Sequence, residues 1–217
     1  MATKRQKWVP AEPEAPDSDG GVVAECELDA GGLSDARVGR LVIRSAIDAE
    51  LVRVAADRVE ASGCTLAGVS IRDVTIDGGD ASNSGLTGAT VRRVRGAGIG
   101  AVGIDFSGAR LEDVVLTNCK LRLARGFEAS MARCRFEDCD LREAEFEGAR
   151  LDRVVFRRCD MTAARLAGVD LSGCDLRGSR VEGLVVSPER LAGVRVDATQ
   201  LPTFAAALGL VVDDPSD

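Results

Sequence analysis

A five-residue period runs through most of this sequence. In CRFEDCDLREAEFEGARLDRVVFRRCDM (residues 134–161) a large apolar residue stands at every fifth position, with a small residue two places before it. These centre positions are Phe136, Leu141, Phe146, Leu151, Phe156 and Met161. Stepping by fives from Leu51 to Val186 gives 28 centres, of which 22 are Leu, Ile, Val, Met or Phe, four are Ala and two are Gly. A helix and a plain strand have periods of 3.6 and 2, so the pattern requires a different architecture.

The period predicts a coil with four sides. Residues two apart in an extended segment point to the same side, so each pentad places two side chains inward and turns a corner with the other three. The two inward columns hold no charged residue, although 29% of the chain is charged. Cys119, Cys139 and Cys159 recur at a spacing of 20, as do Phe136 and Phe156. Four pentads per coil explain this spacing, and seven coils about 4.8 Å apart give a body about 34 Å long.

The pentads CDLRE, ARLDR, VDLSG and CDLRG resemble the pentapeptide-repeat proteins, whose pattern is A(D/N)LXX. The resemblance covers about residues 26–186. It implies a right-handed quadrilateral β-helix, so we expect an all-β solenoid of about 7–8 coils with a short C-terminal helical cap. Some pentapeptide-repeat proteins imitate duplex DNA at DNA gyrase or topoisomerase IV, often giving quinolone resistance.

The chain divides into four segments. We expect a disordered leader over 1–21, the solenoid over 22–186, a helical cap over 187–212 and an acidic tail over 213–217. In the cap, Ser187 is the expected N-cap before Pro188, and Leu201, Phe204 and Leu208 share one helix face. The stretch VDATQLPTFAAALGLVV resembles the C-terminal segment through which a mycobacterial gyrase-inhibiting relative dimerises. Two roles stay open for it: closing the core, or also joining a homodimer.

The repeat is irregular in three places. Before Leu51 the apolar residues follow an offset frame, which predicts an extra bend or bulge near Ser45–Glu50. The stretches 96–106 and 122–131 have glycine at the centres Gly96 and Gly126, and Phe127 follows the second. These stretches are either narrowed or bulged coils, or an indentation or docking bump with Phe127 as a contact residue.

The composition argues against an enzyme. Histidine is absent, which removes the usual general base and the commonest metal ligand. The seven cysteines form no CxxC pair and occupy the small inward column, so we interpret them as core filling and expect no cofactor and no metal. The sequence has neither an apolar run long enough for a membrane span nor a secretory signal, and the chain is expected in the cytoplasm.

The surface charges are predicted to neutralise one another. The spacing of 20 sets Asp113 beside Arg133, Asp138 beside Arg158, Asp160 beside Arg180, and Glu145 between Arg125 and Arg165. The net charge of −7 comes largely from the two ends, whereas duplex DNA carries about one charge per 1.7 Å.

We therefore interpret the chain as a non-catalytic interaction scaffold for an unidentified protein partner. It is not expected to bind nucleic acid directly or to enter a membrane. The alternative is a DNA mimic that modulates a type II topoisomerase. Its acidic patch would be Glu143, Glu145 and Glu147.

Overall fold

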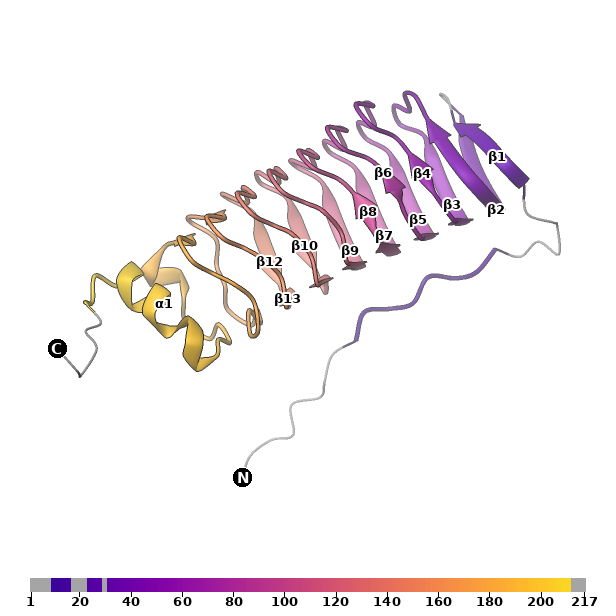
Figure 1. Cartoon of the computed structure of the whole chain (residues 1–217). Helices are drawn as coiled ribbons and strands as arrows, with labels where there is room; N and C mark the ends of the chain where they lie inside the picture. Colours follow the sequence, from indigo (N-terminus) through magenta and orange to yellow (C-terminus); the bar gives the residue numbers. More distant parts are fainter. Residues whose placement is uncertain (1–8, 17–22, 29–30, 212–217) are drawn as a thin grey trace.

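The computed structural model describes residues 9–16, 23–28 and 31–211, and it confirms the solenoid (Figure 1). Parallel strands stack along the rod with a register of 20 residues, as in Leu51 beside Ile71 and Phe136 beside Phe156. The rod has about eight coils, and a short α-helix stands at its C-terminal end. The inward residues form one continuous core along the axis.

Most strands are short because they cover one or two sides of a coil. Their bounds are β1 Val23–Leu28, β2 Gly32–Ile43, β3 Glu50–Ala56, β4 Val59–Glu60, β5 Ser70–Ile76, β6 Gly79–Asp80, β7 Thr90–Ala97, β8 Ile99–Gly100, β9 Arg110–Thr117, β10 Ser130–Ala132, β11 Arg135–Glu137, β12 Arg150–Asp152, β13 Val155–Arg157, β14 Arg165–Leu166 and β15 Val185–Val186. Strands β3, β5, β7 and β9 each continue around a corner, so one strand covers two adjacent sides, whereas β2 pairs with both β3 and β4 and covers three.

Each corner is made by a residue in the left-handed conformation. From Asp48 to Gly183 every fifth residue except Arg58 has φ between about +50° and +139°. Glycine, which adopts this conformation without strain, fills many corners, and Asp and Asn tolerate it better than most residues. The predicted column at Gly68, Gly88 and Gly108 is such a corner, and Glu128 continues it with φ 54°. The corner chemistry therefore sets the five-residue period as much as the core does.

The first coils are shorter than the rest. Strand β1 pairs with β2 at a register of 15 residues, and β2 pairs with β3 and β4 at a register of 18. The register becomes 20 between the pair Val42–Glu60 and the bridge Ser45–Thr65. The frame shift is therefore a loss of two residues just before Ser45, close to the predicted place near Ser45–Glu50, and it is not the extra bend or bulge that was predicted.

The two glycine centres are places where neighbouring side chains fill the space. A Cβ on Gly126 would lie 2.5 Å from Cε2 of Phe106 and 3.0 Å from Cδ1 of Phe146. These two rings come from the coils on either side, and their centroids are 6.0 Å apart across Gly126. A Cβ on Gly96 would likewise lie 2.8 Å from Leu116. The register stays at 20 on both sides, so the coils are narrowed there and not bulged.

The solenoid continues beyond its predicted end at residue 186. The amide of Leu176 donates to the carbonyl of Arg195, and Asp175 bridges to Arg195 at the usual register. The 3-10 helix η1, Pro188–Arg190, lies within this last coil. Ser187 precedes Pro188 as predicted, but its hydroxyl accepts from the amide of Gly168 instead of capping the helix.

The cap is built from the 3-10 helix η2, Ala198–Gln200, and the helix α1, Leu201–Ala207. Asp197 and Gln200 form a capping box at the start of η2. The Gln200 side chain is buried, and its Nε2 donates to the carbonyls of Leu176 and Ser179 at 2.7 Å each. Gln200 therefore gives a partner to the Ser179 carbonyl at the end of the stack and a second donor to the Leu176 carbonyl, which also accepts from the amide of Ser179 at 3.2 Å.

Candidate interaction surface

The six cysteines whose side chains the structure describes are free thiols buried in the core. Burial raises the pKa of the Cys134 thiol to about 12 and that of Cys174 to about 11. Such thiols stay protonated at neutral pH and are poor nucleophiles. The side chain of Cys26 lies outside the described residues.

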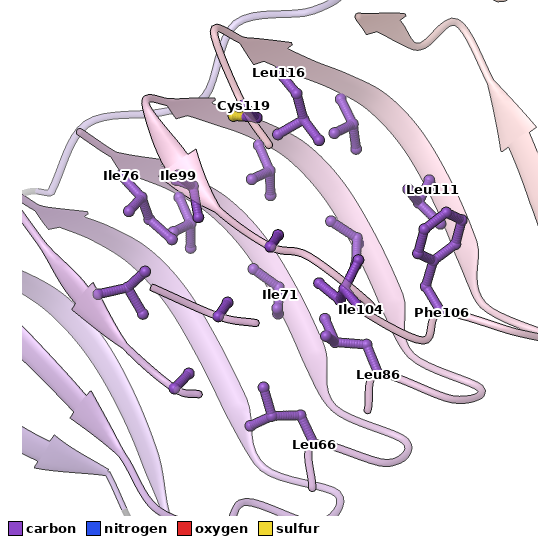
Figure 2. Close-up of a pocket in the computed structure, with 18 of the residues that line it drawn as sticks. Leu66, Ile71, Ile76, Leu86, Ile99, Ile104, Phe106, Leu111, Leu116 and Cys119 are labelled. Carbon is purple, nitrogen blue, oxygen red and sulfur yellow. The ribbon is translucent and has the colours of Figure 1, made fainter. Parts of the chain in front are cut away.

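Inward side chains line one cavity of about 170 Å³ inside the coils between Leu41 and Phe136. Figure 2 shows Leu66, Leu86 and Phe106, which line it from three successive coils. It lies beside the centres Ala61, Ala81 and Ala101, which form one column of small residues. Apart from the Cys119 thiol, no lining side chain carries a polar atom. The cavity is therefore a loosely packed part of the core with nothing to orient a reacting group.

The described residues show two further absences. No group of three His, Cys, Asp or Glu side chains among them could hold a metal ion. No helix in the described ranges is both long enough and apolar enough to cross a membrane.

The predicted acidic patch carries compensating charges. Glu147 accepts from Arg165 at 2.7 Å, and Glu143 lies 3.4 Å from Arg122. Glu145 is half-buried on the neighbouring outward position. Phe127 is exposed at 37% and precedes Glu128, whose amide donates to the carbonyl of Glu147 on the next coil. The four residues thus lie on the surface, with arginines interleaved among the carboxylates.

Pairing between coils extends along the rod. The predicted pairs Asp113–Arg133, Asp138–Arg158 and Asp160–Arg180 are present at 2.8, 2.7 and 3.6 Å. Glu145 stands between Arg125 and Arg165 as predicted, but the ion pairs of these two arginines are with Asp105 and Glu147. These contacts break the surface into local pairs of opposite charge.

The three predicted cap residues divide into two groups. Phe204 is buried against the core at 6% exposure, so it closes the end of the solenoid. Leu201 and Leu208 are 54% and 56% exposed and do not share its environment. Leu210 and Val211 add to the exposed apolar surface at this end. The three residues therefore do not form the single apolar face that was predicted. Phe204 packs against the core, whereas Leu201 and Leu208 are exposed to solvent.

A column of alternating charge occupies one corner of the coils. It consists of Asp35, Arg53, Asp73, Arg93, Asp113 and Arg133, all with φ between 50° and 57°. We call it the corner ladder. Each aspartate accepts hydrogen bonds from both Nε and Nη2 of the arginine on the following coil. Arg93, for example, donates to Asp73 at 2.6 and 2.7 Å. This two-pronged geometry is the strongest form of the arginine–carboxylate pair.

Residues 9–16, VPAEPEAP, lie along this corner, and we call them the strap. The amide of Ala11 donates to Oδ1 of Asp113 at 3.3 Å, and the amide of Glu14 donates to Oδ1 of Asp73 at 3.1 Å. The Glu12 carboxylate pairs with Arg95. Figure 1 shows the segment beside the rod, running toward the β1 end, whereas the chain of the solenoid advances from β1 toward α1. The prediction of a disordered leader over 1–21 was therefore wrong for residues 9–16.

The strap changes the environment of the ladder carboxylates. The Asp73 side chain is 2% exposed and that of Asp113 is 11% exposed, against 33% for Asp35 further along the same ladder. The Arg93 guanidinium, together with the Glu14 amide, holds the pKa of Asp73 below its usual range. Arg133 and the Ala11 amide do the same for Asp113. Two buried carboxylates are thus kept charged by corner arginines of the neighbouring coils and by amides of the strap.

The sequence contains a signal for this site that its inward columns do not reveal. From Arg53 to Arg133 the ladder residues recur at the spacing of 20 in alternating sign, and Pro10, Pro13 and Pro16 recur every third residue. Neither pattern alone predicts a contact, because a segment rich in proline and glutamate is typical of disorder. Three residues of the strap are as long as two coils of the ladder, and this relation is recognised only when the strap is placed against the coils.

These features define the class: a four-sided parallel β-solenoid with five-residue sides and an apolar core. The sequence model of the protein family described as pentapeptide repeats matches residues 104–142 and 139–178, with eight copies. Residues 104–178 are therefore pentapeptide repeats of this family.

Solved structures of the same fold class are similar to it. HetL, a pentapeptide repeat protein involved in heterocyst differentiation regulation in the cyanobacterium Nostoc sp. strain PCC 7120, is 18% identical with a TM-score of 0.42, over 82% of this chain and 90% of HetL. A trypsin-treated variant of QnrB1, a plasmid-mediated fluoroquinolone resistance protein, is 16% identical with a TM-score of 0.40, over 88% of this chain and 99% of QnrB1. No curated protein matches the sequence.

Proposed function

We propose that this chain is a non-catalytic, cytoplasmic scaffold for protein–protein interaction. The observation that carries the proposal is the strap, because the outer surface of the coils already holds a peptide segment through two backbone amides and one ion pair. An extended segment bound by its main chain and an acidic side chain is a common mode of peptide recognition. The free, buried thiols agree with a reducing compartment.

The paired charges favour a scaffold over a DNA mimic. A mimic needs a continuous acidic face, since duplex DNA presents about one charge per 1.7 Å. Here Glu143 and Glu147 are compensated by Arg122 and Arg165. We therefore expect no inhibition of DNA supercoiling by gyrase when purified protein is titrated from nanomolar to tens of micromolar concentration.

The control for that assay is a variant with Glu143, Glu145 and Glu147 changed to Lys. Inhibition by the natural chain that the triple variant loses would contradict the scaffold proposal and favour the mimic. Inhibition that both proteins share would come from another surface and would also contradict it.

The C-terminal end is the proposed homodimer contact. Leu201, Leu208, Leu210 and Val211 are each more than half exposed and lie within eleven residues of one another. A twofold axis through this end would set the same apolar patch of each copy against the other, which is the usual arrangement of a homodimer. Phe204 would stay in the core of its own subunit.

We expect Leu201→Glu combined with Leu208→Glu to convert a dimer into a monomer. The charges would stand in an apolar contact without partners, so the dissociation constant should rise at least a hundredfold, as measured by sedimentation equilibrium. Ile47→Glu changes a residue of equal exposure (56%) near the other end and should leave the dimer intact. A monomeric natural chain at high micromolar concentration would refute the dimer.

A further inference from the structure

Three residues of the strap span nearly the same distance along the rod as two coils of the corner ladder. Ala11 and Glu14 are three residues apart and contact Asp113 and Asp73, which are two coils apart. Two coils span about 9.6 Å, and three residues of a polyproline II segment span about 9.3 Å. The prolines at 10, 13 and 16 favour that conformation and repeat at the same three-residue interval. One repeat of the strap therefore corresponds to one Asp–Arg repeat of the ladder.

A second column beside the ladder takes part in the same match. Its outward residues are Ala55, Thr75, Arg95, Val115 and Arg135, again 20 apart. Glu12 pairs with Arg95. Shifting three residues back along the strap moves two coils forward along the rod, so position 9 falls opposite Arg135. Shifting three residues forward places position 15 opposite Ala55.

This column has unused hydrogen-bonding capacity. Within the part of the chain that the structure describes, Arg95 and Arg135 each bury an Nε that has no hydrogen-bond partner. Arg135 pairs with Glu137 through Nη1 at 3.2 Å, and the valine at strap position 9 has no side-chain group that could accept from its Nε. Leaving a buried guanidinium nitrogen unpaired costs free energy that a suitable acidic ligand would recover. The surface therefore offers hydrogen-bond donors that residues 9–16 do not use.

We propose that this surface is a binding site for extended, acidic, proline-rich peptides with a three-residue repeat, and that residues 9–16 are its resident occupant, held in cis. The inference rests on the proposed scaffold function and names the ligand of one of its surfaces. Recognition comes from amides that follow each proline, which reach the ladder carboxylates, and from acidic side chains, which reach Arg95 and Arg135. A partner segment with this repeat would have to displace the strap.

The binding of the strap to its own solenoid can be weakened by substitution, so the full-length chain can still be used. Replacing Ala11 and Glu14 by Pro deletes both donated N–H groups while keeping the φ of an extended proline-rich segment. The full-length double variant then serves as the receptor. The probe is a fluorescent peptide of the natural sequence KWVPAEPEAPDS (residues 7–18), and binding is followed by fluorescence polarisation.

We expect saturable binding of this peptide to the double variant and at least tenfold weaker binding to the natural chain. A short linker gives the tethered strap an effective concentration in the millimolar range, which a free peptide must overcome. A peptide that carries both proline replacements should not bind either protein. Absence of saturable binding to the double variant, or equal binding to both proteins, would overturn the proposal.

Two peptide variants test the match of periods. Val9→Glu places a carboxylate opposite Arg135 and should tighten binding about two- to fivefold, the range of a partly exposed ion pair. Ala15→Glu adds the same charge opposite Ala55 and should leave the affinity unchanged. Equal gains from the two changes would mean that only overall charge matters, and the register would then be wrong.

Hydrogen exchange on the natural chain gives an independent check that needs no variant. The amides of Ala11 and Glu14 should exchange more slowly than those of Glu12 and Ala15, at a rate independent of protein concentration. Uniform exchange across residues 9–16 would show that the strap is not bound. Protection that grows with concentration would place it on a second copy and overturn the cis arrangement. Neither outcome changes the supercoiling and sedimentation results that test the scaffold.

Discussion

Leu141→Asp is expected to leave the chain largely unfolded in water. Leu141 is 0% exposed and stands in the inward column between Leu121 and Met161. The change removes a buried side chain, which alone costs about 2–5 kcal/mol. It also places a carboxylate among apolar groups without a partner, which adds several kcal/mol. The sum is comparable to the whole stability of a domain, about 5–15 kcal/mol. Far-UV circular dichroism and urea unfolding measure it.

The control for this prediction is the same change at an outward corner. Leu123 is 41% exposed and has φ 59°, a conformation that Asp tolerates better than Leu. Leu123→Asp should therefore shift the free energy of unfolding by no more than about 0.5 kcal/mol. A folded Leu141→Asp variant with a melting curve like that of Leu123→Asp would refute the placement of the inward columns.

Gly126→Leu is expected to destabilise the chain by about 3 kcal/mol or more. The φ of Gly126 is not positive, so the cost does not come from the backbone. It comes from the two rings of Phe106 and Phe146, which occupy the space where a side chain would go. Overpacking a filled core typically costs about 1–3 kcal/mol, and here both rings must move. Urea unfolding monitored by circular dichroism gives the difference.

Two further variants separate this explanation from a general intolerance of leucine. Gly85 has an ordinary φ and open space at its Cβ, so Gly85→Leu should be nearly neutral. Phe106→Ala combined with Gly126→Leu should recover part of the loss, because the introduced leucine fills the volume that the ring vacates. A double variant as unstable as the sum of the single changes would contradict the shared-volume account.

The sequence predicts the solenoid well because its core is nearly one-dimensional. A residue such as Leu141 contacts its counterparts on the coils directly before and after, so the fold can be derived from a spacing of 20 alone. The frame shift before Ser45 was predicted near its true place but with the wrong sign, since an offset frame results from a deletion as readily as from an insertion. Gly126 was harder, because its explanation lies in two rings forty residues apart.

The interaction surface was predicted less well for a physical reason. Glu143, Glu145 and Glu147 stand out as a run of carboxylates, yet their arginine partners come from other coils and from outward positions that the period leaves free. Leu201 and Phe204 are equally apolar in the sequence, and only the cap geometry decides that Phe204 alone is buried. The strap contacts are made by backbone amides, which every residue except proline carries, so no residue type marks them.

The matched periods of strap and ladder limit how this rod can change its length. One additional coil between Asp73 and Asp113 would put an odd number of steps between the two carboxylates. An arginine would then face the amide at position 11 or 14. Two additional coils would restore the signs but would require three more residues between the two amides. The two amide contacts of the strap would therefore survive a change in the number of coils only if coils were gained in pairs, with three strap residues added for each pair.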